Sequence, residues 1–379
     1  MKVAFVHDYI KEYGGAERVL ETLHEIFPKA PIYTSLYLPE FLGPHKQRLS
    51  DWVVKPSILQ WIPFKEKLIS PFRIIAPFIF KSMDFTRYDI VIVSATGAYT
   101  PNVIKKGKTL HICYCHTPPR YLYGYPTARE WKKNALFRFL GETVNHFLRM
   151  VDFKSSQNVD YFIANSKEVA LRIKKFYRCD SRVIYPPVDI PQVQVDFHPS
   201  GGLASHPSSR GYYLAGGRLA RPKRVDLAVA GCTKLHRPLK VFGKEFAGYG
   251  EELRKVAGST IEFLGEVSDK EKFRLMAGAK AFIFPSEFED FGITPVEAMA
   301  VGTPVIALRS GGVQETVIEG KTGIFFNEPT VESLINAIKR FDNLKINPMD
   351  CKNQAKKFSK ERFKREMLKF VREKYARTS

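Results

Sequence analysis

Residues 281–302 read Ala281-Phe-Ile-Phe-Pro-Ser-Glu-Phe-Glu289-Asp-Phe-Gly-Ile-Thr-Pro-Val-Glu297-Ala-Met-Ala-Val-Gly302. The first apolar run predicts a buried strand that ends at Pro285, and the second predicts a helix over Pro295–Ala300. A strand, a tight turn and a helix in this order are the unit from which parallel α/β sheets are built. The stretch therefore predicts an α/β fold with the turn at the carboxyl edge of the sheet, where such folds bind ligands.

The turn carries groups that suit an anionic or hydroxylated ligand. Backbone N–H groups at a helix start lack partners within the helix and can bind a phosphate or sugar hydroxyls. Glu289 enters from the loop and Glu297 from the helix, so the two carboxylates can hold different parts of one elongated ligand. The alternative is a pair of surface carboxylates with no ligand. The candidate binding residues of the turn are Glu289, Asp290, Phe291, Gly292, Ile293, Thr294 and Glu297.

The same strand-and-helix alternation runs through both halves of the chain. Strands are predicted at Val3–Val6, Ile90–Ser94, Leu110–Tyr114, Tyr161–Ala164, Tyr212–Ala215, Leu239–Phe242, Ile261–Leu264, Ala281–Pro285 and Pro304–Ala307. Helices are predicted at Ala16–Ile26, Ser166–Phe176, Glu251–Ala257, Asp269–Met276, Pro295–Ala300 and Val331–Phe341. Prolines, glycines and serines gather in Pro186–Ser209 without apolar periodicity, which predicts the linker between two domains.

Two segments depart from this rhythm. Residues 54–83 mix aromatic, aliphatic and basic side chains with prolines, which indicates a surface insertion. Residues 356–375 predict one basic amphipathic helix that must pack on something.

A second basic motif, Gly217-Arg-Leu-Ala-Arg-Pro-Lys-Arg224, directly follows a predicted strand. Arg218 offers a planar fork and Lys223 a compact ammonium, a combination suited to the oxygens of a diphosphate. Taken alone, such a run is more often a solvated basic loop. Its place at the carboxyl end of a strand favours a ligand site.

Two motifs of the first half occupy the corresponding places. Gly14 and Gly15 follow the first strand and permit close approach of the backbone to a phosphate, although a glycine turn without a ligand is an equal alternative. His116 follows the strand that ends near Tyr114 and precedes a rigid Pro-Pro turn. A histidine at a strand end is usually structural, but the turn would hold this imidazole at the rim of a cleft.

Charge and cysteine content bound the class of protein. The 379 residues carry a formal charge of +20, which indicates a polyanionic partner: nucleic acid, phosphorylated substrate or anionic lipid. Residues 1–185 hold 28 Lys and Arg against 16 Asp and Glu, residues 186–351 hold 20 of each, and residues 352–379 hold 11 against 3. Five cysteines without metal spacing favour a reducing compartment. With no predicted signal peptide or spanning helix, we expect a soluble intracellular protein.

Together these motifs resemble glycosyltransferase family 4, the retaining group with the GT-B fold, and more loosely its bacterial and archaeal mannosyltransferases of surface polysaccharide synthesis. In the second half the resemblance rests on Gly217-Arg218-Leu219 with Lys223, Phe263-Leu264-Gly265 with Val267, Glu289 with Glu297, and Gly311-Gly312 with Glu315. In the first half it rests on Gly14-Gly15 and the His116 segment.

The resemblance implies two Rossmann-like domains facing each other across a cleft. An acceptor-binding domain would span residues 1–185, with the helix of residues 352–379 crossing back to it, and a nucleotide-sugar-binding domain would span residues 186–351. Arg218 and Lys223 would bind the donor diphosphate, Glu289 and the following amides the sugar, Glu297 the ribose, and His116 the donor sugar near its reacting carbon. No metal or other cofactor is expected.

For the base, the resemblance points to residues 265–269, where Val267 and Asp269 would contact it. Asp269 could accept hydrogen bonds from guanine, which favours GDP-mannose as donor. A UDP-sugar donor stays open, as does a nucleotide-sugar epimerase of the same fold. A nucleic-acid-binding protein is a remote alternative suggested by charge alone, and no recognition motif supports it.

The acceptor is expected to be a lipid-linked glycan or other oligosaccharide. The basic, apolar segment 54–83 and the cations between Arg129 and Arg149 predict a peripheral protein on the cytoplasmic, anionic face of the cell membrane. The alternative is that Trp61, Phe72 and Phe78 fill the core of the first domain.

Overall fold

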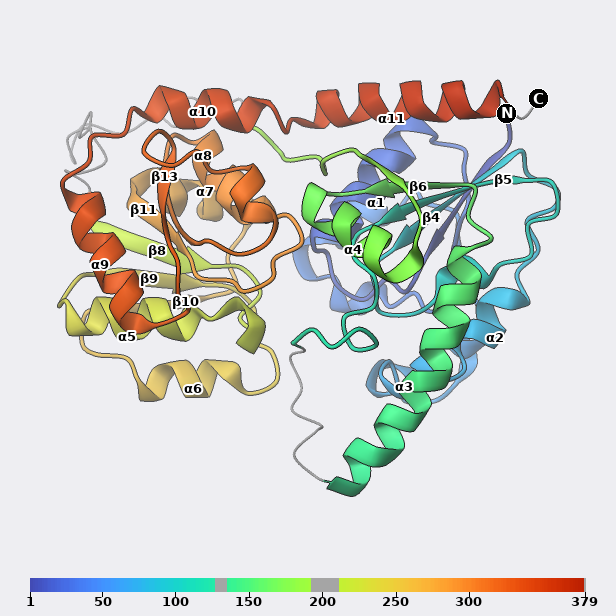
Figure 1. Cartoon of the computed structure of the whole chain (residues 1–379), viewed down its shortest axis with the longest axis horizontal. Coiled ribbons are helices and arrows are strands. Elements are labelled where there is room, and N and C mark those ends of the chain that lie inside the picture. Colours follow the sequence, from blue (N-terminus) through green and yellow to red (C-terminus); the bar gives the residue numbers. More distant parts are fainter. Residues whose placement is uncertain (127–134, 192–210, 378–379) are drawn as a thin grey trace. The chain divides into compact units, whose positions relative to one another are not determined.

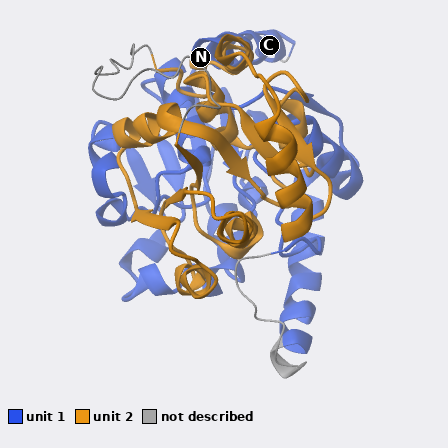
Figure 2. Cartoon of the chain, turned by 90° about the vertical axis from the view of Figure 1, so that its left-hand side faces the viewer, with its two compact units in different colours: residues 1–126, 130–187, 361–379 blue, residues 127–129, 188–360 orange. Residues whose placement is uncertain are grey.

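The computed structural model describes residues 1–126, 135–191 and 211–377. These residues divide into two compact units, which Figure 2 colours separately. Within the described residues, the first unit holds 1–126, 135–187 and 361–377, and the second holds 188–191 and 211–360. Most of the linker predicted at Pro186–Ser209, and Arg129 of the predicted basic run, lie outside the described residues.

The first unit is built on a parallel sheet of seven strands in the order β3-β2-β1-β4-β5-β6-β7. Figure 1 labels β4, β5 and β6 of this sheet. Its strands are β1 (Val3–His7), β2 (Ile32–Thr34), β3 (Val54–Pro56), β4 (Ile90–Ala95), β5 (Leu110–Cys115), β6 (Tyr161–Ala164) and β7 (Ser181–Val183). Its helices are α1 (Gly15–Ile26), α2 (Ala76–Lys81), α3 (Ala135–Ser156), α4 (Lys167–Tyr177) and α11 (Lys360–Tyr375). Strand order 2-1-4 means that the chain changes direction beside β1, so β1 and β4 lie at the switch point where parallel sheets hold ligands.

Two apolar clusters cover the two faces of this sheet. Alternate residues of one strand point to opposite faces, so Phe5 enters one cluster and Val6 the other. The cluster around Phe5 includes Phe363 and Met367 of α11. Their spacing of four residues places both side chains on one helix face. The C-terminal helix is therefore part of the first unit's core.

The second unit is a parallel sheet of six strands in the order β10-β9-β8-β11-β12-β13. Its strands are β8 (Tyr212–Gly216), β9 (Leu239–Phe242), β10 (Ile261–Gly265), β11 (Ala279–Phe284), β12 (Val305–Leu308) and β13 (Gly323–Phe326). Its helices are α5 (Val225–Lys234), α6 (Tyr249–Lys255), α7 (Asp269–Gly278), α8 (Ile293–Ala300), α9 (Val331–Asp342) and α10 (Pro348–Lys356). The change of order beside β8 again makes a switch point, between β8 and β11.

The predicted fold class is confirmed: both units are parallel α/β sheets, and each predicted strand and helix of residues 1–342 has a counterpart. Two predictions need correction. Residues 54–83 are more than a surface insertion, because β3 joins the sheet and Phe72 and Phe80 are buried in the core. The predicted tail helix is α11 and ends at Tyr375 as expected, but it begins at Lys360 rather than Lys356, which is the last residue of α10.

Aromatic side chains of segment 54–83 divide between core and surface. Phe72 is buried, as the core alternative expected, whereas Trp61 is 85% exposed and Phe78 is 73% exposed. Among the described residues, none of the helices has the length and apolar character to cross a bilayer.

Candidate functional site

The loop between β11 and α8 presents backbone rather than side chains at the start of the helix. Gly292 is the N-cap residue of α8 and has φ of 86°, a left-handed conformation that favours glycine. Phe291 is 2% exposed, and its ring packs against Phe358 with 5.4 Å between centroids. Ile293 and Thr294 begin the helix and are half-buried. The N–H groups of this first turn, which have no partner within the helix, are polar groups that the loop can offer to a ligand.

Two further glycines hold this loop in place. The N–H of Gly312 donates to the carbonyl of Glu289 over 2.8 Å. A Cβ atom on Gly311 would lie 2.2 Å from that carbonyl oxygen, and one on Gly312 would lie 2.4 Å from the Asp290 carbonyl oxygen. Side chains at positions 311 and 312 would therefore push the loop away from β12, which explains this glycine pair.

Glu289 is tied to the basic motif that follows β8. Its Oε2 lies 2.5 Å from Lys223 Nζ and accepts a hydrogen bond from Ser286 Oγ over 2.7 Å. The guanidinium of Arg218 is exposed and lies over the Phe246 ring, 4.5 Å from its centroid. The fold thus brings Lys223 and Glu289, predicted from separate motifs, into direct contact.

Glu297 lies in a second, more buried ion pair. Its side chain is 3% exposed, and its Oε1 lies 2.7 Å from Lys272 Nζ. The same ammonium lies 3.0 Å from Oδ1 of Asp269, at the start of α7. Lys272 therefore joins the carboxylate predicted to bind ribose to the one predicted to contact the base. Val267, just before them, is half-buried.

In the first unit, Gly14 is the N-cap residue of α1, and Gly15 is the first residue of that helix. Glu17 caps the start of this helix, because its Oε2 accepts a hydrogen bond from the Gly14 N–H over 2.9 Å. Gly14 has extended backbone with φ of −119°, so its conformation does not require glycine. A Cβ atom there would lie 3.3 Å from Glu17 Oε2.

His116 directly follows β5 and is only 8% exposed. Its Nε2 lies 2.9 Å from Ser94 Oγ, at the carboxyl end of β4, and its ring meets that of Tyr114 edge to face. Burial lowers the pKa of His116 to about 3. The imidazole is consequently neutral at physiological pH, and it lies within a network of buried groups rather than at an open rim.

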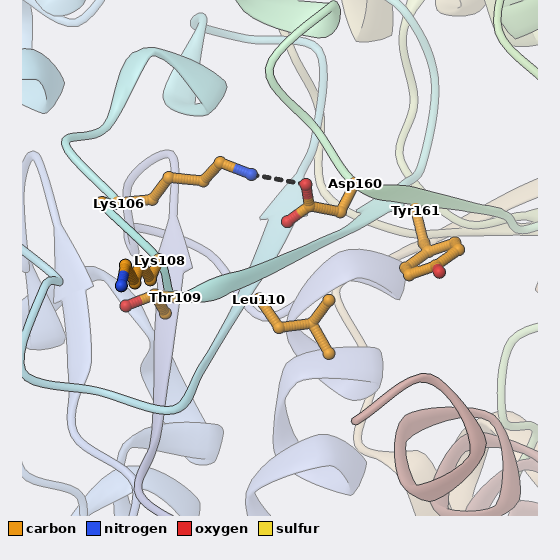
Figure 3. Close-up of a pocket in the computed structure, with 7 residues that line it drawn as sticks. Lys106, Lys108, Thr109, Leu110, Asp160 and Tyr161 are labelled. Carbon is orange, nitrogen blue, oxygen red and sulfur yellow. Dashed lines mark hydrogen bonds and ion pairs between the residues drawn. The ribbon is translucent and has the colours of Figure 1, made fainter. Parts of the chain in front are cut away.

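The predicted site residues thus form two sets. Gly14, Gly15 and His116 follow β1 and β5 in the first unit, and the remaining ones follow β8, β10 and β11 in the second. A cavity of about 430 Å³ lies elsewhere, lined by Lys106, Lys108, Asp160 and their neighbours (Figure 3). These residues precede β5 and β6, so the cavity lies at the amino edge of the sheet, opposite to His116.

Comparison with known proteins places the chain in a family. Residues 13–192 match the model of Glycosyltransferase Family 4, and residues 205–358 match that of Glycosyl transferases group 1. The chain belongs to glycosyltransferase family 4. It is 25% identical over 372 residues to alpha-1,3/1,6-mannosyltransferase ALG2 of Mus musculus, which covers 86% of this chain and 84% of that protein. A shorter match to ALG2 of Dictyostelium discoideum reaches 41% identity over 99 residues, 26% of this chain and 22% of that protein.

Other similar proteins are named for activities other than mannosyl transfer. Glycogen synthase of Mycobacterium tuberculosis is 33% identical over 132 residues, 32% of each chain. Among solved structures, sucrose-phosphate synthase from Thermosynechococcus elongatus covers 99% of this chain and 100% of its own, with a TM-score of 0.71 at 18% identity. Anabaena HepE in complex with UDP and glucose covers 98% and 99%, with a TM-score of 0.69 at 17% identity. These likenesses show the GT-B fold.

Several residues at the candidate site were not predicted from the sequence: Ser286, Lys272, Ser94, His7 and Glu17. Lys272, Ser94 and His7 were identified through partners distant in sequence, Glu17 through the helix cap, and Ser286 through Glu289, three residues further along the chain. A local signal existed for two of them, since Lys272 lies one helical turn after Asp269 and Ser94 ends a predicted strand. The interaction partner of each of these residues was identified only in the structure.

Proposed function

We propose that this glycosyltransferase transfers mannose from GDP-mannose to a lipid-linked glycan, with retention at the anomeric carbon. The observation that carries the mannosyl assignment is the match to alpha-1,3/1,6-mannosyltransferases over most of the chain. The more local matches to glycogen synthases keep a different hexose as the second candidate, and the complex of Anabaena HepE with UDP and glucose keeps a UDP-sugar donor.

In this proposal the second unit binds the donor. Arg218 and Lys223 bind the diphosphate, and the N–H groups of the first turn of α8 bind the sugar or phosphate oxygens. Glu289 then accepts hydrogen bonds from the sugar hydroxyls. The ion pair between Lys223 and Glu289 supports this assignment, because it holds a cation and an acceptor side by side next to the α8 N-terminus.

The reaction proposed is a front-face displacement. As the bond to the anomeric carbon breaks, negative charge grows on the departing diphosphate, and one of its oxygens helps to take the proton of the acceptor hydroxyl. Fixed cations and helix N–H groups that face this charge stabilise the transition state more than the ground state. Because Arg218 and Lys223 supply positive charge, we expect the rate to be unchanged by a chelator of divalent cations.

The base contact is assigned to Asp269. Its carboxylate, oriented by Lys272, would accept hydrogen bonds from the amino and imino groups of guanine, and uracil has no matching amino donor. Calorimetry with the Asp269→Ala variant should show a larger loss of affinity for GDP than for UDP. Equal losses for the two nucleotides would refute this assignment.

A membrane-facing surface is proposed for the first unit. Trp61, Phe64 and Phe78 are each at least 69% exposed, and Lys67 lies over the Phe64 ring. Phe139, Phe147 and Met150 of α3 add further exposed apolar side chains. Aromatic groups that enter the headgroup region beside lysines bind anionic bilayers. A lipid-linked acceptor in the same bilayer would then lie close to the bound enzyme.

Sedimentation with liposomes tests this surface. Binding of the wild type should rise with the fraction of anionic lipid and fall with salt, because salt screens the charges. A Trp61→Ser, Phe78→Ser double variant should lose binding while it keeps activity on a short water-soluble acceptor. The matched control is Met349→Ser, an exposed apolar residue of the second unit. Binding that does not depend on the fraction of anionic lipid, or that persists in the double variant, would contradict the proposal.

The donor proposal is tested by thermal shift with GDP, UDP, ADP and TDP sugars. A ligand that binds only the folded state raises the melting temperature. We expect the largest shift with GDP-mannose, and Glu289→Ala should reduce it. A larger shift with a UDP-sugar would favour the second candidate. Conversion of the donor to an epimer without an acceptor would identify an epimerase instead, and a shift produced by nucleic acid alone would favour the remote alternative.

A further inference from the structure

Four buried side chains join two parts of the first unit that the proposed function treats separately, the Gly14 loop and His116. Glu17 accepts a hydrogen bond from the Gly14 N–H through Oε2, and its Oε1 lies 3.5 Å from His7 Nε2. On the other side of its ring, His7 Nδ1 lies 3.1 Å from Ser94 Oγ. Ser94 Oγ in turn lies 2.9 Å from His116 Nε2.

These groups are shielded from water, so their hydrogens must be arranged among themselves. His7 and Ser94 are 0% exposed, Glu17 is 6% exposed and His116 is 8% exposed. Their residues come from β1, β4, α1 and the end of β5, which meet at the switch point of the sheet.

The serine hydroxyl makes the two imidazoles depend on each other. A hydroxyl has one hydrogen, so Ser94 can donate to only one of the two ring nitrogens and must accept from the other. If His7 Nδ1 accepts from Ser94, then His116 Nε2 must donate to Ser94. If His7 Nδ1 donates instead, His116 Nε2 must accept. The tautomer of His116 is therefore set by that of His7.

The carboxylate of Glu17 decides between the two arrangements. It can only accept, so it favours a hydrogen on the nearby His7 Nε2. His7 Nδ1 then accepts from Ser94, and Ser94 accepts from His116 Nε2. We propose that Glu17, His7 and Ser94 are positioning residues that fix His116 as its Nε2–H tautomer and leave Nδ1 as a hydrogen-bond acceptor.

This inference deepens the proposed function and rests on it for its catalytic meaning. An acceptor nitrogen on His116 can take a hydrogen bond from a hydroxyl of the donor sugar, whereas an N–H in the same place could only donate and would require that hydroxyl to accept. Burial lowers the pKa of His116 to about 3, so the ring stays neutral and has a single tautomer to fix. The same hydrogen-bonded groups link the Gly14 loop to the tautomer of His116.

Glu17→Gln is the variant that tests the relay, because it should reverse the relay without removing the cap. Glutamine can make the same cap, since its Oε1 can accept from the Gly14 N–H. Its amide nitrogen then faces His7 Nε2 and donates to it. His7 must carry its hydrogen on Nδ1, Ser94 must donate to His116 Nε2, and His116 becomes the Nδ1–H tautomer.

The readout is long-range ¹H–¹⁵N correlation spectroscopy of protein labelled with ¹⁵N-histidine, which distinguishes the two neutral tautomers and needs no substrate. The His116 signals are assigned by their loss in His116→Gln. We expect Nε2–H in the wild type and Nδ1–H in Glu17→Gln. In the Ser94→Ala background, the change at position 17 should no longer alter His116, because the link is broken.

The matched control is Glu25→Gln, the same chemical change at an exposed position of α1, which should leave the His116 tautomer unchanged. An Nδ1–H tautomer in the wild type, or the same tautomer in the wild type and Glu17→Gln, would overturn the proposal. With GDP-mannose, Glu17→Gln should lower kcat by about tenfold, because a sugar hydroxyl that donates to Nδ1 in the wild type must turn and accept from Nδ1–H in the variant. If the tautomers switch but no nucleotide sugar is consumed, the relay stands and the proposed function fails.

Discussion

Glu289 and Glu297 each face a lysine in the second unit, but in different surroundings. The side chains of Glu289 and Lys223 are 12% and 33% exposed, whereas those of Glu297 and Lys272 are 3% and 10% exposed. An ion pair that water reaches contributes about 1 kcal/mol or less. Removal of one partner from a buried pair costs about 3–5 kcal/mol, because a charge is left without compensation. We therefore expect a change at Glu289 to reduce donor binding with little loss of stability, and a change in the Glu297–Lys272 pair to reduce stability as well.

Glu289→Gln should abolish most of the transfer activity while the melting temperature stays close to that of the wild type. The amide keeps the shape of the side chain but cannot accept from the sugar hydroxyls through two charged oxygens. Steady-state kinetics and thermal melts on the same preparations check this. Glu319→Gln, which alters another ion pair of the second unit, is the control and should retain activity. A variant with wild-type turnover would remove Glu289 from the site.

Lys272→Met should lower the free energy of unfolding by about 3 kcal/mol, because it leaves the buried Glu297 carboxylate unpaired. The Lys272→Met, Glu297→Gln double variant should recover much of that stability, since no charge then remains at that position. Neither protein should bind GDP as well as the wild type if Glu297 binds ribose. Urea unfolding and calorimetry measure the two effects. Recovery of affinity together with stability would mean that the pair serves the fold alone.

At the scale of elements, strand β5 has a buried histidine near each end. His111 is 0% exposed and its Nε2 lies 3.1 Å from Asn102 Oδ1, and His116 follows the last residue of the strand. Burial, with a smaller contribution from Lys106, lowers the pKa of His111 to about 3. Both imidazoles are therefore buried in neutral form, which makes the strand sensitive to acid.

His111 allows this sensitivity to be measured outside the candidate site. An unfolded histidine takes up its proton near pH 6.5, and folded His111 does so near pH 3. Unfolding therefore takes up a proton between these values, and stability falls as the pH is lowered through that window. From pH 7 to pH 5 the wild type should lose about 2 kcal/mol more than His111→Gln. Urea unfolding at both pH values measures the difference, in which other titrating groups cancel. Equal losses would contradict the assigned pKa.

Helix α11 is predicted to be essential to the stability of the first unit. Phe363 is 0% exposed and meets Tyr114 edge to face, with 5.8 Å between ring centroids. Phe363→Ala should lower the free energy of unfolding by about 3–5 kcal/mol, the cost of a large cavity in a core. Lys369→Ala on the same helix, where the side chain is 75% exposed, is the control and should change stability little. A small loss for Phe363→Ala would mean that the helix packs loosely.

At the scale of the whole molecule, the central strands could be predicted because both of their faces are buried. Such strands are continuous apolar runs, and β4 spans Ile90–Ala95 where Ile90–Ser94 was predicted. Strands β2, β3 and β7 have three residues each and were missed, because a pattern so short has no periodicity to detect. Helix α3 was missed as well, since several of its apolar side chains are exposed and do not form a single buried stripe.

The candidate site could be predicted only as far as local motifs reach. Gly292 and Glu289 follow from the strand-turn-helix pattern, since the turn and the helix start are neighbours in sequence. Lys272 and Ser94 could not be identified in this way, because their roles depend on partners 25 and 22 residues away. Burial also determines whether a titratable side chain is charged. The neutral state of His116 depends on its surroundings in the fold rather than on its sequence neighbours.

The reaction that we propose for this chain is transfer of mannose from GDP-mannose with retention. The most direct measurement is NMR of the product formed from GDP-mannose labelled with ¹³C in the sugar, in the presence of lipid-linked oligosaccharides. The one-bond coupling between C1 and its hydrogen reports the anomeric configuration of the new linkage. We predict an α-mannoside, formed by the wild type and not by Glu289→Gln. A β-mannoside, free mannose or an epimerised donor as the product, or turnover of UDP-sugars alone, would contradict the claim.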